Sequence, residues 1–206
     1  MEELSRLPAA TWLLIGAAAA LGLLLFWGWR WYRRYRARKT LHAAVTAGCA
    51  DHLRDSLVPD GMGGSFHIDF LLLTLRGVVV IDLRDVKGNI FGGDQMAEWT
   101  VMDGARRFTF TNPQSALYDR IAAVKAVAGD VPVEGRIVFT RHGRFPKGLP
   151  KWTLMLDALR AEFPAADFEA PAETIARFHD GWQRLRTEVK PSNMRTTPRN
   201  YARRAQ

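Results

Sequence analysis

An uncharged stretch of 23 residues near the amino terminus constrains this chain more than any other feature. The stretch runs from Leu7 to Trp29 and contains no Asp, Glu, Lys or Arg. A helix of roughly 20 apolar residues spans the hydrocarbon core of a bilayer. A core helix of a globular domain would keep a polar stripe, which this segment lacks. The sequence therefore predicts one transmembrane helix over residues 9–29.

The residues on either side of this stretch predict its orientation. Glu2 and Glu3 precede it, whereas tryptophans, a tyrosine and several arginines follow it from Trp27 onward. A cleavable signal peptide has positive charge before its apolar run. Aromatic residues favour the membrane interface, and Lys and Arg favour the cytoplasmic side. We therefore expect a single-pass protein of the inner (cytoplasmic) membrane, with residues 1–8 as a short extracytoplasmic N-terminus and the remaining domain in the cytoplasm.

The net charge of +8 is concentrated in two segments that flank a mildly acidic middle. Residues 30–39 carry +6 and residues 184–206 carry +6, whereas residues 40–183 carry −3. A domain that binds a polyanion over its whole surface would be basic throughout. We expect residues 30–39 to be a basic juxtamembrane segment that contacts anionic lipid headgroups. Residues 189–206 are expected to form a basic flexible tail. A nucleic-acid role for either segment stays open, and the sequence identifies no protein partner.

Cysteine and histidine usage excludes two classes of small stabilised domain. Cys49 is the one cysteine of the chain, so an internal disulfide framework is excluded. The five histidines are scattered and form no Cys/His cluster with the spacing of a structural zinc site.

Turn signals and hydrophobic patterning divide residues 40–188 into alternating strands and helices. Asn112-Pro113 is typical of a helix start, with Asn as the cap and Pro in the first position. The pattern predicts a mixed α/β (α+β) domain, with a central mixed sheet and flanking helices, preceded by one transmembrane helix. The expected elements are modest helical character over 40–57, strands at 66–75, 78–84, 89–92, 98–102 and 107–111, a helix from 113, a strand at 133–140, and helices at about 151–163 and 171–188.

The strand at 78–84 is apolar on both faces, as a central buried strand would be, but it ends with Asp82 and Arg84. Side chains two residues apart project from the same face of a strand. If Arg76-Gly77 forms a two-residue hairpin turn, Asp69 lies opposite Arg84 on that face. A three-residue loop would move one strand's side chains to the other face.

Two carboxylates and a cation on one sheet face have two interpretations. In the first, Asp69 and Asp82 are metal ligands for Mg²⁺ or Mn²⁺, and Arg84 stabilises phosphate charge during phosphodiester hydrolysis. These three residues are then the catalytic candidates. In the second, the two acids only neutralise Arg84 near the end of the sheet. Their spacing does not decide between the two.

The segment HIDFLLLTLRGVVVIDLRDVKGNIFGG (67–93), followed by Trp99 and Asn112-Pro113, resembles the nuclease-related domain (NERD) family. The resemblance covers roughly residues 45–145. It implies a restriction-endonuclease-like core of the PD-(D/E)xK superfamily and a role in DNA processing. An amino-terminal transmembrane segment also occurs in that family.

The resemblance assigns roles to individual residues. Asp69 matches the family's metal-binding aspartate, and Asp82 stands where the family usually has glutamate. Arg84 stands where the family has lysine, while Lys87-Gly88 matches as it is. Arginine in place of lysine is not conservative, because a guanidinium does not deprotonate and is a planar fork. Lys87 has the wrong strand parity to replace that lysine unless a bulge intervenes.

Two further positions depart from the family pattern. Ala116 stands where the family has a helix glutamine, and Cys49 stands where an upstream glutamate is expected. Asp51 and Asp55 are weak candidates to replace that glutamate. The sequence thus leaves two functions open. The first is a membrane-anchored, Mg²⁺-dependent nuclease whose phosphate contacts come from residues 140–148 and Arg106-Arg107. The alternative is a catalytically degenerate nuclease fold that acts as a membrane-tethered nucleic-acid or protein binding module.

Overall fold

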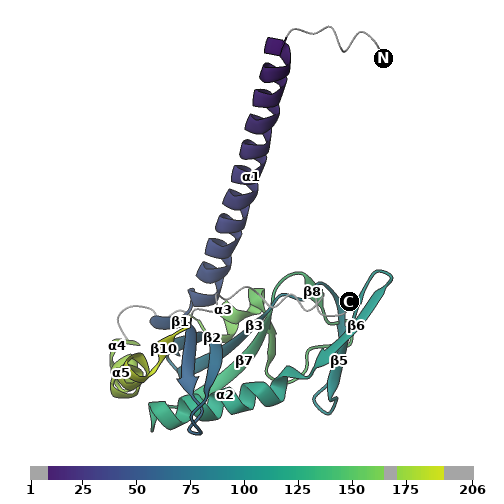
Figure 1. The fold of residues 1–206 in the computed structure, drawn as a ribbon. Coiled ribbons are helices and arrows are strands. Elements are labelled where there is room, and N and C mark those ends of the chain that lie inside the picture. The colour runs from purple at the N-terminus through teal and green to yellow at the C-terminus, as the bar shows by residue number, and fades with distance from the viewer. Residues whose placement is uncertain (1–8, 165–170, 193–206) are drawn as a thin grey trace. The chain divides into compact units, whose positions relative to one another are not determined.

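The computed structural model describes residues 9–164 and 171–192; the predicted N-terminus 1–8 and residues 193–206 of the predicted tail lie outside them. The chain divides into two compact units, Met1–Ala43 and Ala44–Gln206. The elements, shown in Figure 1, are α1 (Ala9–Thr46), β1 (Asp51–Pro59), β2 (Ser65–Thr74), β3 (Gly77–Arg84), β4 (Gly88–Phe91), β5 (Glu98–Asp103), β6 (Arg106–Thr111), α2 (Pro113–Ala128), β7 (Val133–Phe139), β8 (Gly143–Arg144), β9 (Thr153–Met155), α3 (Leu156–Glu162), α4 (Pro171–Ala176), α5 (His179–Glu188) and β10 (Lys190–Pro191).

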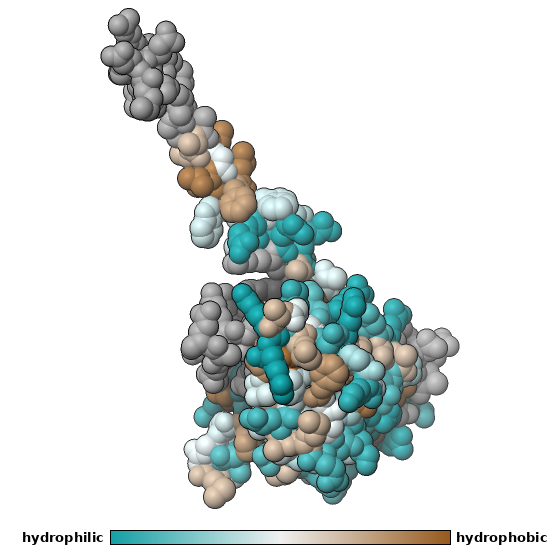
Figure 2. All heavy atoms as spheres, turned by 90° about the vertical axis from the view of Figure 1, so that its right-hand side faces the viewer, coloured by the Kyte–Doolittle hydropathy of each residue, from teal (hydrophilic) through white to brown (hydrophobic). Residues whose placement is uncertain are grey.

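Helix α1 makes up most of the first unit and exposes large apolar side chains. Leu21, Leu23, Leu24, Leu25, Phe26 and Trp27 are each more than half exposed, and Figure 2 shows hydrophobic side chains grouped on this helix. Among the residues that the structure describes, no helix combines the length and apolarity needed to cross a bilayer. The helical prediction for 40–57 is wrong beyond Thr46, because Asp51–Pro59 is a strand that pairs with β2.

The second unit contains two sheets. The larger has the strand order β10-β1-β2-β3-β7-β9, and the smaller has the order β6-β5-β4-β8. In the larger sheet, β3 pairs with β7 and β7 with β9 in parallel, whereas the other pairs are antiparallel. Helix α2 packs on one face of this sheet through Leu117 and Val124, which belong to the buried core. The prediction of a mixed sheet with flanking helices is confirmed.

Strand β3 lies at the centre of the core, which explains why it is apolar on both faces. All eight of its residues are buried. Its neighbours in the sheet, β2 and β7, are not edge strands, because β1 and β9 pair with them on their other sides. A strand with helices or loops over both faces reads as a continuous apolar run instead of an alternating one. Asp82 and Arg84 are therefore charges within a dry environment, and each needs a partner there.

The hairpin between β2 and β3 has a two-residue loop, as predicted, but its position is different. Thr74 pairs with Gly77, so the loop is Leu75-Arg76 and Gly77 is the first residue of β3. The pairing of β2 with β3 is therefore shifted by two residues relative to the prediction. Phe70 lies opposite Ile81, whereas the predicted turn would place it opposite Leu83. Because the shift is even, Asp69, Asp82 and Arg84 stay on one face. Continuing this register places Asp69 beside Asp82, not beside Arg84.

Three C-terminal predictions need correction. The expected helix at 171–188 is two helices, α4 and α5, separated by a turn at Arg177 and Phe178. The expected helix at 151–163 begins only at Leu156, because Thr153–Met155 pairs in parallel with β7 as strand β9. Strand β10 lies within the segment expected to be a flexible tail. It pairs with β1, with Leu57 opposite Lys190, and so extends the folded part of the chain to residue 191.

Candidate functional site

Asp82 and Arg84 form a buried, two-point ion pair at the end of β3. Nε of Arg84 donates to Oδ1 of Asp82 over 3.1 Å, and Nη2 donates to Oδ2 over 2.8 Å. The two side chains are 6% and 5% exposed. A bidentate guanidinium–carboxylate pair is among the stronger polar contacts in proteins, because the geometry of the two groups matches. The planar fork of Arg84 is thus engaged with Asp82.

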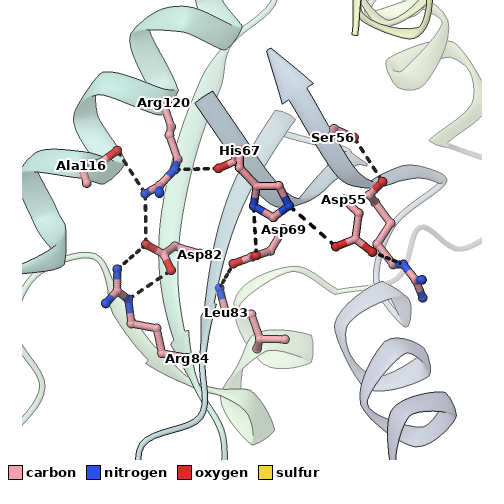
Figure 3. Close-up of polar contacts among 10 residues, drawn as sticks. Asp55, Ser56, His67, Asp69, Asp82, Leu83, Arg84, Ala116 and Arg120 are labelled. Carbon is pink, nitrogen blue, oxygen red and sulfur yellow. Dashed lines mark hydrogen bonds and ion pairs between the residues drawn. The ribbon is translucent and has the colours of Figure 1, made fainter. Parts of the chain in front are cut away.

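A second guanidinium reaches the same carboxylate from helix α2. Nη1 of Arg120 lies 3.2 Å from Oδ2 of Asp82, and the Arg120 side chain is only 13% exposed. The backbone carbonyls of His67 and Ala116 accept further hydrogen bonds from Arg120. Figure 3 shows the two arginines approaching Asp82 from β3 and from α2. Both oxygens of Asp82 therefore already accept charge-assisted hydrogen bonds.

Asp69 is used differently from Asp82. Its Oδ2 accepts a hydrogen bond from the backbone N–H of Leu83 over 2.8 Å, which replaces a ladder bond where β2 and β3 diverge. Its Oδ1 lies 3.7 Å from Nδ1 of His67. On the other side of His67, Nε2 lies 3.9 Å from Oδ1 of Asp55 (Figure 3). The site is therefore a row of acids and bases across β1, β2, β3 and α2.

The arrangement does not fit a bound Mg²⁺ or Mn²⁺. These ions take carboxylate oxygens that are free to coordinate them, but Asp82 gives both of its oxygens to guanidinium groups and Asp69 gives one to Leu83. A cation at Asp82 would also have to compete with the positive charges of Arg84 and Arg120, which already contact this carboxylate. Within the described part of the chain, no three His, Cys, Asp or Glu side chains form a group that could hold a metal ion. We assign no catalytic step to a metal here.

Two other residues singled out in the sequence, Lys87 and Asp51, pair outside this cluster. Lys87 is 76% exposed and pairs with Asp103, so it does not replace a lysine at position 84. Asp51 accepts hydrogen bonds from Trp182 and Arg186 of α5. Asp55, in contrast, does lie near the candidate site, through His67.

Asn112 caps α2 as predicted. Its side-chain oxygen accepts a hydrogen bond from the backbone N–H of Gln114 over 2.9 Å. Ala116, one turn later, contributes its carbonyl to Arg120. Arg120 is four residues after Ala116, so the two positions share one helix face. Position 116 thus carries no glutamine side chain, and the side chain that contacts Asp82 from α2 is Arg120, one turn further on.

Sequence reasoning missed Arg120 and His67. His67 is two residues before Asp69 on the same strand, so strand parity alone placed it on the site's face. Arg120 carried a weaker signal, a single charge among the apolar positions of the α2 face. Neither residue type at that spacing indicates a metal site or a nuclease.

Comparison with protein-family models matches residues 32–140 to the model described as Nuclease-related domain. The match includes β1 to β7 and all the residues of the candidate cluster. A domain of this kind generally depends on a divalent metal ion, which contrasts with the two arginines on Asp82. Searches among curated proteins and among solved structures found no match.

Proposed function

Because the chain belongs to the nuclease-related domain family, we propose that it is a membrane-tethered nucleic-acid binding protein whose nuclease-type site is closed by its own arginines. The role in DNA processing that the family resemblance implies makes DNA the polymer that we propose. The fold would serve as a binding module, built on a restriction-endonuclease-like core, at the cytoplasmic face of the inner membrane.

One observation carries the proposal: both oxygens of Asp82 are held by Arg84 and Arg120. A buried carboxylate that is neutralised in this way is a poor metal ligand, because a metal would first have to displace two guanidinium groups. Separating a buried ion pair costs several kcal/mol, roughly 3–5 when one partner is removed. The second candidate function, Mg²⁺-dependent hydrolysis, would need that rearrangement before any chemistry.

The small sheet provides a surface suited to phosphate. Arg107, Met102, Asn89 and Arg144 are successive cross-strand partners from β6 to β8, and all four are exposed. Direct cross-strand partners project from the same face. Two arginines therefore stand on one open face of the sheet, where they can contact the phosphates of a polynucleotide without reading its sequence.

The membrane tether is supported by the uncharged sequence 7–29 and by the exposed apolar side chains of α1. Leu21, Leu24 and Leu25 are 58%, 70% and 65% exposed, which is costly in water and favourable in lipid. The basic residues of 30–39 would follow the lipid boundary and contact anionic headgroups.

The nuclease and binding hypotheses separate in one assay on the full chain, purified in detergent. Plasmid and single-stranded DNA are incubated with Mg²⁺ or Mn²⁺, with EDTA controls, and oligonucleotide binding is followed by fluorescence anisotropy. We expect binding without metal-dependent cleavage, and affinity that falls steeply with salt. Replacing both Arg107 and Arg144 with alanine should reduce the slope of log affinity against log salt by about 1.4, roughly 0.7 per lost contact with single-stranded DNA.

Two variants make the assay decisive. Arg160→Ala removes an exposed arginine from α3 and should leave the slope unchanged. Asp69→Asn keeps an oxygen for the N–H of Leu83 but loses the negative charge, so it tests the site without removing this contact. Cleavage by the wild type that disappears in Asp69→Asn would refute the closed site and establish the nuclease.

The tether has a separate test in membranes from cells that produce the full chain. We expect the wild type to stay in the pellet after extraction with alkaline carbonate. Changing Leu21, Leu24 and Leu25 together to arginine should release it, since each arginine at a helix centre costs about 2.5–3.5 kcal/mol on insertion scales. The same three positions changed to alanine are the matched control and should stay in the pellet. Extraction of the wild type by carbonate would reject the tether.

A further inference from the structure

A second site lies at the start of α2 and shares no lining residue with the Asp82 cluster. It is a pocket of 330 Å³ whose lining includes Asp94, Gln114, Tyr118, Lys151 and Trp152. Three separate segments meet there: the loop after β4, the first turns of α2, and the residues before β9.

One wall of the pocket is a fixed carboxylate. Gln114, which is 6% exposed, donates from Nε2 to Oδ1 of Asp94 over 2.9 Å and to the carbonyl of Lys151 over 2.9 Å. The backbone N–H of Lys151 donates to the same Oδ1 over 2.8 Å. Oδ2 of Asp94 receives no donor from the described residues. The Gln114 and Lys151 hydrogen bonds hold the pKa of Asp94 below its usual 3.8, so the group is an ionised acceptor at neutral pH.

The other wall is aromatic. The rings of Tyr118 and Trp152 meet edge to face, with their centroids 5.8 Å apart. Tyr118 is 52% exposed and Trp152 is 38% exposed. Cζ of Arg136 lies 5.8 Å from the Trp152 ring centroid, and Arg136 is itself paired with Glu134 and Glu162. Trp152 also has a φ of 63°, a conformation that bulky residues seldom adopt. The surrounding contacts thus hold an exposed indole in an unfavourable backbone conformation, as is frequent where a protein holds a ligand.

We propose that this pocket binds a nucleobase that carries an exocyclic amino group. The base would stack on the exposed aromatic surface, and its amino group would donate to Oδ2 of Asp94. The ammonium of Lys151 at the rim would lie toward the phosphate. This inference deepens the nucleic-acid binding proposed above, because it supplies base contacts in addition to the phosphate contacts of the small sheet.

Two other ligand classes fit less well. An anion alone, such as phosphate, would be repelled by the ionised Asp94 at the pocket wall. A quaternary or primary ammonium, which aromatic pairs can attract, would face the like charge of the Lys151 ammonium at the pocket. A neutral planar ring with a hydrogen-bond donor avoids both penalties.

The test compares oligo-dC with oligo-dT of equal length, since cytosine has an exocyclic amino group where thymine has a carbonyl. Anisotropy is measured with the full chain in detergent. We expect oligo-dC to bind about fivefold or more tightly. Asp94→Asn keeps an acceptor for Gln114 but replaces Oδ2 with an NH₂ donor, so the preference should vanish or invert. Asp130→Asn, which removes an exposed acid just after α2, is the matched control and should keep the preference.

The stacking contact is tested by removing each ring. Trp152→Gly should weaken binding of both oligonucleotides by about tenfold, within the range measured for stacked bases. Glycine adopts a φ of 63° without steric cost, so this change adds no backbone strain. Tyr118→Ala, at an exposed helix position, is expected to act in the same direction. Thermal melting of each variant confirms that the domain stays folded.

The outcomes separate this inference from the proposed function. If the wild type binds both oligonucleotides equally, and the three pocket variants bind as it does, the pocket inference is overturned and phosphate-mediated binding stands. If cytidine monophosphate binds in a Trp152-dependent way but no oligonucleotide does, the pocket takes free nucleotides and the proposed function fails. Competition of the mononucleotide with oligo-dC for the same site supports both.

Discussion

Replacing Asp82 with alanine is expected to destabilise the domain by about 3–5 kcal/mol, because the change leaves Arg84 buried without its carboxylate. Asp82 receives three hydrogen bonds from two guanidinium groups, and Arg84 is 4% exposed. Arg120 would lose the same partner, although two backbone carbonyls still accept from it. This effect is on folding, so loss of any activity in Asp82→Ala would not by itself identify a catalytic residue.

The measurement is urea unfolding of the full chain in detergent, followed by tryptophan fluorescence. Asp103→Ala is the matched control, because it also removes an aspartate from a pair, here with the 76% exposed Lys87. Exposed pairs contribute about 0–1 kcal/mol, so Asp103→Ala should shift the midpoint only slightly. An equally small shift for Asp82→Ala would show that water or another group replaces the ion pair, and would remove the main support for a closed site.

Changing Gly77 to alanine should be comparably severe, at roughly 3–5 kcal/mol, because backbone strain and a steric clash add together. Gly77 has a φ of 114°, and a Cβ placed on it would lie 2.3 Å from the carbonyl oxygen of Pro132. That oxygen also accepts the N–H of Val78 over 2.9 Å, so it cannot move without breaking a bond that joins β3 to the start of β7.

Gly104→Ala separates the two contributions. Gly104 has a φ of 62°, but a Cβ there would meet nothing within 4 Å. The variant should therefore cost about 1 kcal/mol, the ordinary penalty for alanine in the left-handed region. Equal urea midpoints for the two variants would mean that β3 and Pro132 separate easily, which would contradict the tight packing at this end of the sheet.

Gly77 also shows where sequence reasoning succeeded and where it stopped. A glycine between two hydrophobic runs correctly indicated a two-residue loop and a hairpin. The glycine was then placed inside the turn, because positive φ is most often needed there. In the structure, glycine is also needed at the first residue of β3 because a Cβ there would clash with the backbone of Pro132. This contact joins segments 55 residues apart, and no local pattern reveals it.

The candidate site was likewise predictable only in part. Strand parity placed Asp69, Asp82 and Arg84 on one face, and the even shift of the hairpin preserved that result. The interpretation in which the acids neutralise Arg84 anticipated its pairing with Asp82, but the other partners were not predictable. Asp69 bonds to a backbone N–H where two strands diverge, and Arg120 approaches Asp82 only because α2 packs across the sheet.

The sequence by itself determined the β2–β3 hairpin, the cap of α2, the buried central strand and the membership in a nuclease-related family. These follow from periodicity, turn chemistry and short motifs, which act over a few residues. Only the tertiary structure decided that Asp82 is neutralised by two guanidinium groups and that an aromatic and acidic pocket opens beside α2. Both depend on side chains brought together from distant segments. At Asp82, burial also removes the water that would otherwise satisfy the charge.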